Sequence, residues 1–392
     1  MLPPKSRLVR VVCASALIFA GLTFRLAADP PFSIDYSADV LANVAGGLDR
    51  GAAYDGALTL SGSGTLARTA SGFTLTVAAS ALHLHGSNLT GRYVGDSFGV
   101  SNLQADAGAR LFEAYLEAGW RNDALSLRIG RLAADSEFAQ ADAAQLFVNS
   151  AFGWAPVIGQ PAIAATSAPA ALPIWPLATP AVRLRLGRMD GAYLALGVFD
   201  SAVEDPAIRD RHGLDFRRPA LDRLAWIAEA GARGRLLDDQ PVTVKIGFWQ
   251  IDAPSDHLDG TTTHGGNTGW YLVLEQRLAA SGITAFAHAG GARSDRNVIS
   301  AYFDLGLTLV KPLPGRDDDT AGLAFARACP SNGARELFHA GTEDVIELTY
   351  AAKLAPHLTL QPELQWVRHP GALGGAPARD AVVAGVRLNR SW

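Results

Sequence analysis

Charged side chains recur at alternate positions inside otherwise apolar segments of this chain. Glu113 and Glu117 lie four residues apart, Arg183 and Arg185 lie two apart, and Arg128 sits within "LSLRIG". Successive side chains of a β-strand point to opposite faces, so each charge falls on the face opposite the apolar residues. Acids and bases mixed on one wet face suit hydrogen bonding to uncharged, hydroxyl-rich solutes. A ring of arginine and lysine alone would instead favour anions.

The other reactive side chains form no pattern typical of catalysis or metal binding. No serine lies in a nucleophile-elbow motif, and "GSGTLA" lacks the third glycine of a dinucleotide fingerprint. His83 and His85 share one strand face, but a metal site would need a third ligand. We therefore predict no catalytic residue, no metal site and no cofactor. The charges either set the selectivity of a channel, or only keep its wall wet and pair across strands.

Composition narrows the class of protein further. The 392 residues are 48% hydrophobic but only 18% charged, against about 25% in soluble domains. Residues 1–28 carry Lys5, Arg7 and Arg10 before a short apolar run. They predict a secretory signal peptide, with an N-terminal membrane anchor as the alternative. Without them the chain loses four of its 34 basic residues and none of its 38 acidic ones, leaving a net charge of −8. Nucleic acid is therefore not an expected partner.

Residues 29–392 repeat one pattern, an alternation of apolar and polar residues with a period of two. Such alternation is typical of strands with one apolar and one wet face. About sixteen strands are predicted, near 33–41, 56–66, 73–82, 110–120, 124–131, 181–187, 192–199, 225–232, 241–249, 270–278, 283–290, 301–310, 319–328, 344–354, 357–367 and 380–391.

The segments between these strands alternate between short and long. Tight turns fall at 121–123, 188–191, 279–282 and 355–356, and longer connections at 83–109, 132–180, 200–224, 250–269, 329–343 and 368–379. Transmembrane barrels place short periplasmic turns at one end and long extracellular loops at the other. We therefore predict an all-β fold, a transmembrane antiparallel β-barrel of about 16 strands in the outer membrane. Its apolar face would contact lipid.

Aromatic residues support the lipid-facing assignment. Residues Trp120, Trp270, Tyr350, Trp366 and Trp392 lie near strand ends on the apolar face, as an aromatic girdle requires. The alternation also assigns Phe112 to that face. A charge on the same face would cost about 2–4 kcal/mol at mid-membrane. The wet face carries the charges instead.

The longest connection, 132–180, is rich in proline and alanine and contains Trp175. It either folds into the pore and narrows it, or forms an external loop. If it folds inward, the ring of Trp175 could stack on a sugar beside the lumen charges.

Nine segments, taken in order, resemble the OprB-type carbohydrate-selective porins of Gram-negative outer membranes. They are "YSADVLANVAGGLDRG", "VGDSFGVSNL", "RLFEAYLEAGW", "LRIGRLAADSEF", "LFVNSAFG", "LPIWPLATPAVRLR", "LVKPLPGRDDDTAGLAFA", "IELTYAAKLAPHLTLQPELQWVRHPG" and "AVVAGVRLNRSW". The resemblance implies a sixteen-stranded barrel that passes sugars by diffusion, favouring monosaccharides such as glucose.

The resemblance also adds candidate residues for the pore. It places Asp135 and Glu137 of "DSEF", and Asn149 of "VNSAFG", in a loop that lies near the constriction. The family usually has an asparagine before the acid, where this chain has Asp135 and Ser136. The full set of constriction candidates is Glu113, Glu117, Arg128, Asp135, Glu137, Asn149, Trp175, Arg183 and Arg185.

Alternative functions remain open on the sequence. They are a general or organic-anion-selective porin, an outer-membrane enzyme or adhesin on a barrel, and a soluble periplasmic β-protein. The partners expected of the porin are small-molecule sugars and outer-membrane lipid, with the chain acting as a monomer or a trimer. Outer-membrane barrels commonly end on an aromatic residue that the assembly machinery reads, a role that Trp392 fits.

Overall fold

The structure is a computed structural model of the whole chain. It describes residues 32–160, 170–203, 210–216, 223–260, 262–263, 265–278 and 282–392. The predicted signal peptide, 1–28, lies outside the described residues. No helix in the described ranges is long and apolar enough to cross a membrane.

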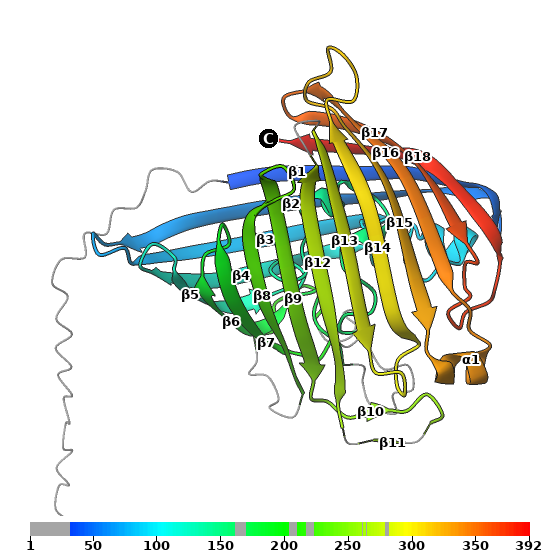
Figure 1. Cartoon of the computed structure of the whole chain (residues 1–392), viewed down its shortest axis with the longest axis horizontal. Helices are drawn as coiled ribbons and strands as arrows, with labels where there is room; N and C mark the ends of the chain where they lie inside the picture. Colours follow the sequence, from blue (N-terminus) through cyan, green and yellow to red (C-terminus); the bar gives the residue numbers. More distant parts are fainter. Residues whose placement is uncertain are drawn as a thin grey trace, which may run out of the picture.

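Sixteen antiparallel strands of the described chain close into one barrel (Figure 1). The strands are β1 (Phe32–Gly47), β2 (Gly51–Arg68), β3 (Thr74–Gly86), β4 (Gly108–Trp120), β5 (Leu125–Leu132), β6 (Thr179–Gly187), β7 (Ala192–Asp200), β8 (Leu224–Leu236), β9 (Gln240–Ile251), β12 (Asn267–Leu278), β13 (Ile283–Ala292), β14 (Ile299–Val310), β15 (Thr320–Pro330), β16 (Glu343–Ala355), β17 (Leu358–Arg368) and β18 (Arg379–Ser391). The predicted barrel and its strand number are confirmed.

Short elements occupy the connections. They are β10 (Ser255–Asp256) and β11 (Thr262–Thr263), which pair with each other, the single-turn segments η1 (Thr90–Val94), η2 (Ala143–Leu146) and η3 (Ser150–Phe152), and the helix α1 (Asn332–Phe338). All lie in connections at one end of the barrel, here called the loop end. The opposite, turn end carries connections such as 69–73, 121–124 and 188–191.

The last strand closes the barrel by pairing with the first. Arg387 of β18 lies opposite Asp39 of β1, and its guanidinium donates to both Asp39 carboxylate oxygens at 2.7 Å. Trp392 continues the ladder, since its backbone N–H donates to the Ile34 carbonyl at 2.9 Å. A closed sheet leaves no free edge to protect. The chain can therefore keep pairing up to its final residue.

The two faces of the wall divide as the alternation predicts. On β16, Leu348 is 53% exposed to the outside, whereas its neighbour Glu347 is fully buried inside the barrel. Trp270 and Trp366 are also exposed on the outer face, at 42% and 44%. In a membrane this outer surface contacts lipid, and the inward charges avoid it.

Two details differ from the sequence prediction. Phe112 is buried against Leu82 and Leu84 instead of facing lipid, because the register of β3 and β4 shifts between Ala79 and Ala81. Such a bulge inserts a residue and re-aims the side chains after it. The alternation of connection lengths is also not strict, since the loop-end connections 48–50 and 293–298 are shorter than the turn-end connection 311–319.

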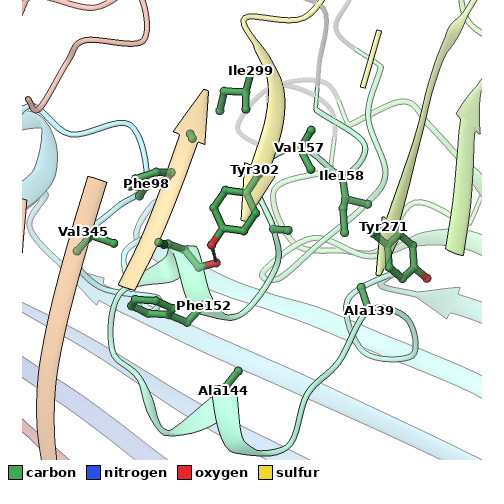
Figure 2. Packing of buried hydrophobic residues seen from close by; sticks show 14 of the residues in the cluster. Phe98, Ala139, Ala144, Phe152, Val157, Ile158, Tyr271, Ile299, Tyr302 and Val345 are labelled. Atoms are coloured by element: carbon green, nitrogen blue, oxygen red, sulfur yellow. Dashed lines mark hydrogen bonds between the residues drawn. The ribbon is translucent and has the colours of Figure 1, made fainter. Parts of the chain in front are cut away.

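The described parts of the connection from β5 to β6, residues 133–160 and 170–178 and here called the inner loop, pack inside the barrel. Its Phe147 and Phe152 rings lie 5.0 Å apart, and Phe147 lies 5.5 Å from Phe286 of β13. Figure 2 shows Phe152 beside Tyr302 of β14, whose hydroxyl donates to the Ala151 carbonyl at 2.8 Å. This apolar cluster fixes the loop against the wall formed by the later strands.

Candidate functional site

Four charged side chains meet on the inner wall beside the inner loop. Glu117 comes from β4, Arg128 from β5, Arg183 from β6 and Glu137 from the inner loop. Arg183 donates to Glu117 Oε1 and to Glu137 Oε2, both at 2.7 Å. Arg128 donates to Glu117 Oε2 at 2.8 Å and also pairs with Glu137. We call these four residues the charge cluster.

Strand register places three members of the charge cluster side by side. Glu117 lies directly opposite Arg128 across the β4–β5 hairpin. Arg128 in turn lies opposite Arg183 across β5 and β6. Directly opposed residues share a face and have close Cβ atoms. Two like charges would repel there, and the carboxylates of Glu117 and Glu137 bridge them.

The members of the charge cluster differ in their access to the lumen. The Arg183 side chain is fully buried, whereas those of Glu117, Arg128 and Glu137 are 21%, 16% and 11% exposed. Arg128 also lies over the Tyr115 ring, 4.0 Å from its centroid. Arg183 therefore holds the other charges in position, and a solute in the lumen meets Glu117, Arg128 and Glu137.

Arg185 lies two residues beyond Arg183 on β6, toward the turn end, opposite Ser126 of β5. Within the described chain it makes no salt bridge, and its Nε is buried without a hydrogen-bond partner. The two acids and two bases of the charge cluster balance each other, and among the described residues Arg185 lies beside them without a carboxylate partner.

Asp135 and Trp175 lie apart from the charge cluster. They line a cavity of about 730 Å³, formed by the inner loop and by segments of the β3–β4 and β7–β8 connections. The Trp175 backbone N–H donates to Asp135 Oδ2 at 2.8 Å. Asp135 precedes Glu137 by two residues, so the cavity adjoins the charge cluster.

Glu113 and Asn149 hold the inner loop by hydrogen bonds. Glu113 Oε1 accepts from the Ala133 backbone N–H at 2.9 Å. Asn149 is fully buried: its Oδ1 accepts from the Ala151 N–H at 3.0 Å, and its Nδ2 donates to Gln365 of β17 at 2.9 Å. Neither residue is among the bridged charges.

Three further glutamates, which the sequence did not single out as site residues, perform the same task. Their carboxylates lie on the barrel wall and accept hydrogen bonds from backbone N–H groups of the inner loop. Glu229 accepts from Ala139 (2.8 Å), Glu275 from Ala143 (2.7 Å), and Glu347 from Val148 and Asn149 (both 2.8 Å). Hydrogen bonds with an ionised partner are stronger than neutral ones. In the sequence, the feature that these three residues share is a glutamate on the polar face of a predicted strand.

The two histidines weighed as metal ligands lie on the outer face. His85 Nε2 is 3.1 Å from the Tyr36 hydroxyl and 3.0 Å from that of Tyr54. Within the described ranges, no group of three or more His, Cys, Asp or Glu side chains could hold a metal ion.

Comparison with known proteins supplies the family. The model of the carbohydrate-selective porins, OprB family, matches residues 49–391. The chain belongs to the OprB family. This outer-membrane porin is similar to Porin B of Pseudomonas aeruginosa, with 23% identity over 356 residues, 78% of this chain and 74% of Porin B.

Two solved structures of Pseudomonas putida OprB share the fold of this OprB-family chain. The high-pH structure has a TM-score of 0.79 at 19% identity, covering 93% of this chain and 94% of its own. The low-pH structure has a TM-score of 0.56 at 17% identity, covering 92% of each chain. Family and fold together make this protein a channel for carbohydrates across the outer membrane.

Proposed function

We propose that this porin passes neutral monosaccharides such as glucose, and that the charge cluster is its constriction. The observation that carries the proposal is the mutual pairing of Glu117, Arg128, Glu137 and Arg183. The pairing cancels the net charge while leaving charged donors and acceptors at the lumen surface. Such groups hydrogen-bond to hydroxyls without selecting an ion of either sign.

The same pairing disfavours an organic-anion pore. An anion channel needs cations free to face the solute, and both Arg128 and Arg183 are held by glutamates. Arg185, beside the charge cluster on β6, makes no salt bridge within the described residues, and its Nε has no hydrogen-bond partner. We propose that it binds sugar hydroxyls on the turn-end side of the charge cluster.

Liposome swelling tests the proposed selectivity. Proteoliposomes should swell faster in glucose than in gluconate, a solute of similar size that carries a negative charge. The physical reason is that both arginines of the charge cluster are already held by glutamates and do not bind the anion, while the neutral sugar bonds to donors and acceptors of both signs. Equal swelling in both solutes would make the protein a general porin, and faster swelling in gluconate would make it an anion porin.

We also propose that the outer-membrane assembly machinery recognises Trp392. The side chain is 61% exposed and stacks beneath Arg390, whose guanidinium lies 5.4 Å from the ring centroid. Every member of the charge cluster comes from one chain. A monomer therefore contains a complete pore, and a trimer would contain three.

Deleting Trp392 should lower the yield of folded barrel in the outer membrane several-fold, with the unfolded chain retained in the periplasm. The barrel itself loses one backbone hydrogen bond, so it should still fold in detergent. Heat-modifiable gel mobility of membrane fractions measures the yield, with Trp392→Phe as the control that keeps an aromatic end. Wild-type membrane yield after the deletion would exclude this recognition role.

A further inference from the structure

The cavity that Asp135 and Trp175 line differs chemically from the charge cluster beside it. It holds about 730 Å³, within the range of roughly 300–1,000 Å³ that is usual for small-molecule sites. Asp135 is the one ionisable side chain among its described lining residues, and none of these residues is a cation. Its polar lining is otherwise almost entirely of the amide type, from Asn102, Gln104, Gln140 and Gln160.

Hydrogen bonds to neighbouring protein groups fix these amides in place. Gln160 Nε2 donates to the Ile299 carbonyl at 2.9 Å, and Gln104 Nε2 donates to Asn88 at 2.7 Å. A carboxamide carries two N–H groups and two oxygen lone pairs. Gln104 is held at both ends, since its Oε1 also accepts from the Thr90 backbone N–H at 3.3 Å. Each side chain still keeps a second N–H or a second lone pair for a ligand. Groups positioned in advance lose little entropy when a ligand binds.

Two indole rings complete the lining. Trp154 is held by its Nε1, which donates to the Ile158 carbonyl at 3.0 Å. Trp175 packs against the buried Phe112 cluster and is fixed through its backbone bond to Asp135. An indole offers a flat apolar face with a negative quadrupole. The C–H groups on one side of a pyranose, which are slightly positive, match that face.

We infer that this cavity is a capture site for neutral hexopyranoses, separate from the constriction and on its loop-end side. The inference rests on the proposed passage of neutral sugars. A sugar first stacks on Trp175 and bonds to the fixed amides, and then moves to the bridged charges. No cation is among the described lining residues, so the site offers no partner to the anionic group of a uronate or sugar phosphate. Burial raises the pKa of the Asp135 carboxyl to about 7, and in its ionised form this group repels them. The capture site therefore favours neutral sugars over anionic ones, and the bound sugar then moves through the charge cluster.

Sugar-dependent current noise in planar bilayers measures binding inside the channel. Trp175→Ala should raise the dissociation constant for glucose roughly tenfold, because it removes the flat apolar ring on which the sugar stacks. Trp175→Phe keeps a ring and should give an intermediate value. Trp270→Ala, which removes an indole from the outer face, should leave the constant unchanged.

Further arms separate this site from the constriction. Arg185→Ala should shift the reversal potential in a salt gradient, which Trp175→Ala should leave unchanged, and Asp135→Asn should strengthen binding of glucuronate but not of glucose. Sugar-free conductance near the wild-type value shows that each variant is folded. A glucose dissociation constant within twofold of wild type in both Trp175→Ala and Trp175→Phe would overturn the capture site, even if liposomes still swell faster in glucose. If liposomes containing the wild-type protein showed no faster swelling in glucose than in gluconate, the proposed function would be overturned instead.

Discussion

Replacing Arg183 with alanine should make the channel markedly more selective for cations and weaken its block by sugars. Arg183 is fully buried and bridges Glu117 and Glu137. Without it, two carboxylates share Arg128 alone, and the constriction gains one unit of net negative charge. Removing one partner from a buried ion pair also costs about 3–5 kcal/mol of stability. The reversal potential in a salt gradient measures the selectivity, and glucose-dependent noise measures the block.

Two controls separate the charge of Arg183 from its geometry. Arg183→Lys restores the charge but not the planar fork that reaches both glutamates. It should recover most of the ion selectivity and little of the sugar block. Arg188→Ala removes an arginine paired with Asp190 on the exposed β6–β7 turn. It should change neither the reversal potential nor the block by glucose. An unchanged reversal potential in Arg183→Ala would mean that the charges only keep the lumen wet.

The parts of this site that could be predicted are those set by a single hairpin. The tight turn after Trp120 brings β5 back against β4, so alternation alone puts Glu117 and Arg128 on the same inward face. Their direct opposition follows from that turn. The opposition of Arg128 and Arg183 does not follow, because the inner loop separates them and a long loop does not define register. Glu137 was recognised only through the family resemblance.

The errors and omissions have physical causes that a periodic pattern does not contain. Phe112 turned inward because a bulge shifts the strand by one residue, and every side chain beyond a shift changes face. The loop-holding role of Glu229 and Glu275 was missed because their partners are backbone N–H groups. Such groups are present at every residue but proline, so the sequence carries no mark of which ones are bound.

The bonds that Glu347 makes to the inner loop should control the width of the pore. Its two carboxylate oxygens accept the N–H groups of Val148 and Asn149, each at 2.8 Å. Glu347→Gln replaces one acceptor with an NH₂ group that faces a donor, so one buried N–H loses its partner. The cost is about 1–3 kcal/mol. We expect the loop to shift locally, with a larger and noisier single-channel conductance and weaker discrimination between glucose and larger sugars.

Glu363 provides the matched control for this prediction. It lies on the adjacent strand β17, faces the same interior and is 5% exposed, yet within the described chain neither of its oxygens has a hydrogen-bond partner. Glu363→Gln makes the same substitution in the same wall but releases no loop N–H group. It should leave conductance quiet and near the wild-type value, and replacing a buried carboxyl that has no hydrogen-bond partner in the described chain should not lower stability. If both variants became equally noisy, lumen charge rather than loop anchoring would set the pore width. If both stayed quiet, the apolar packing of Phe147 and Phe152 would suffice to hold the inner loop.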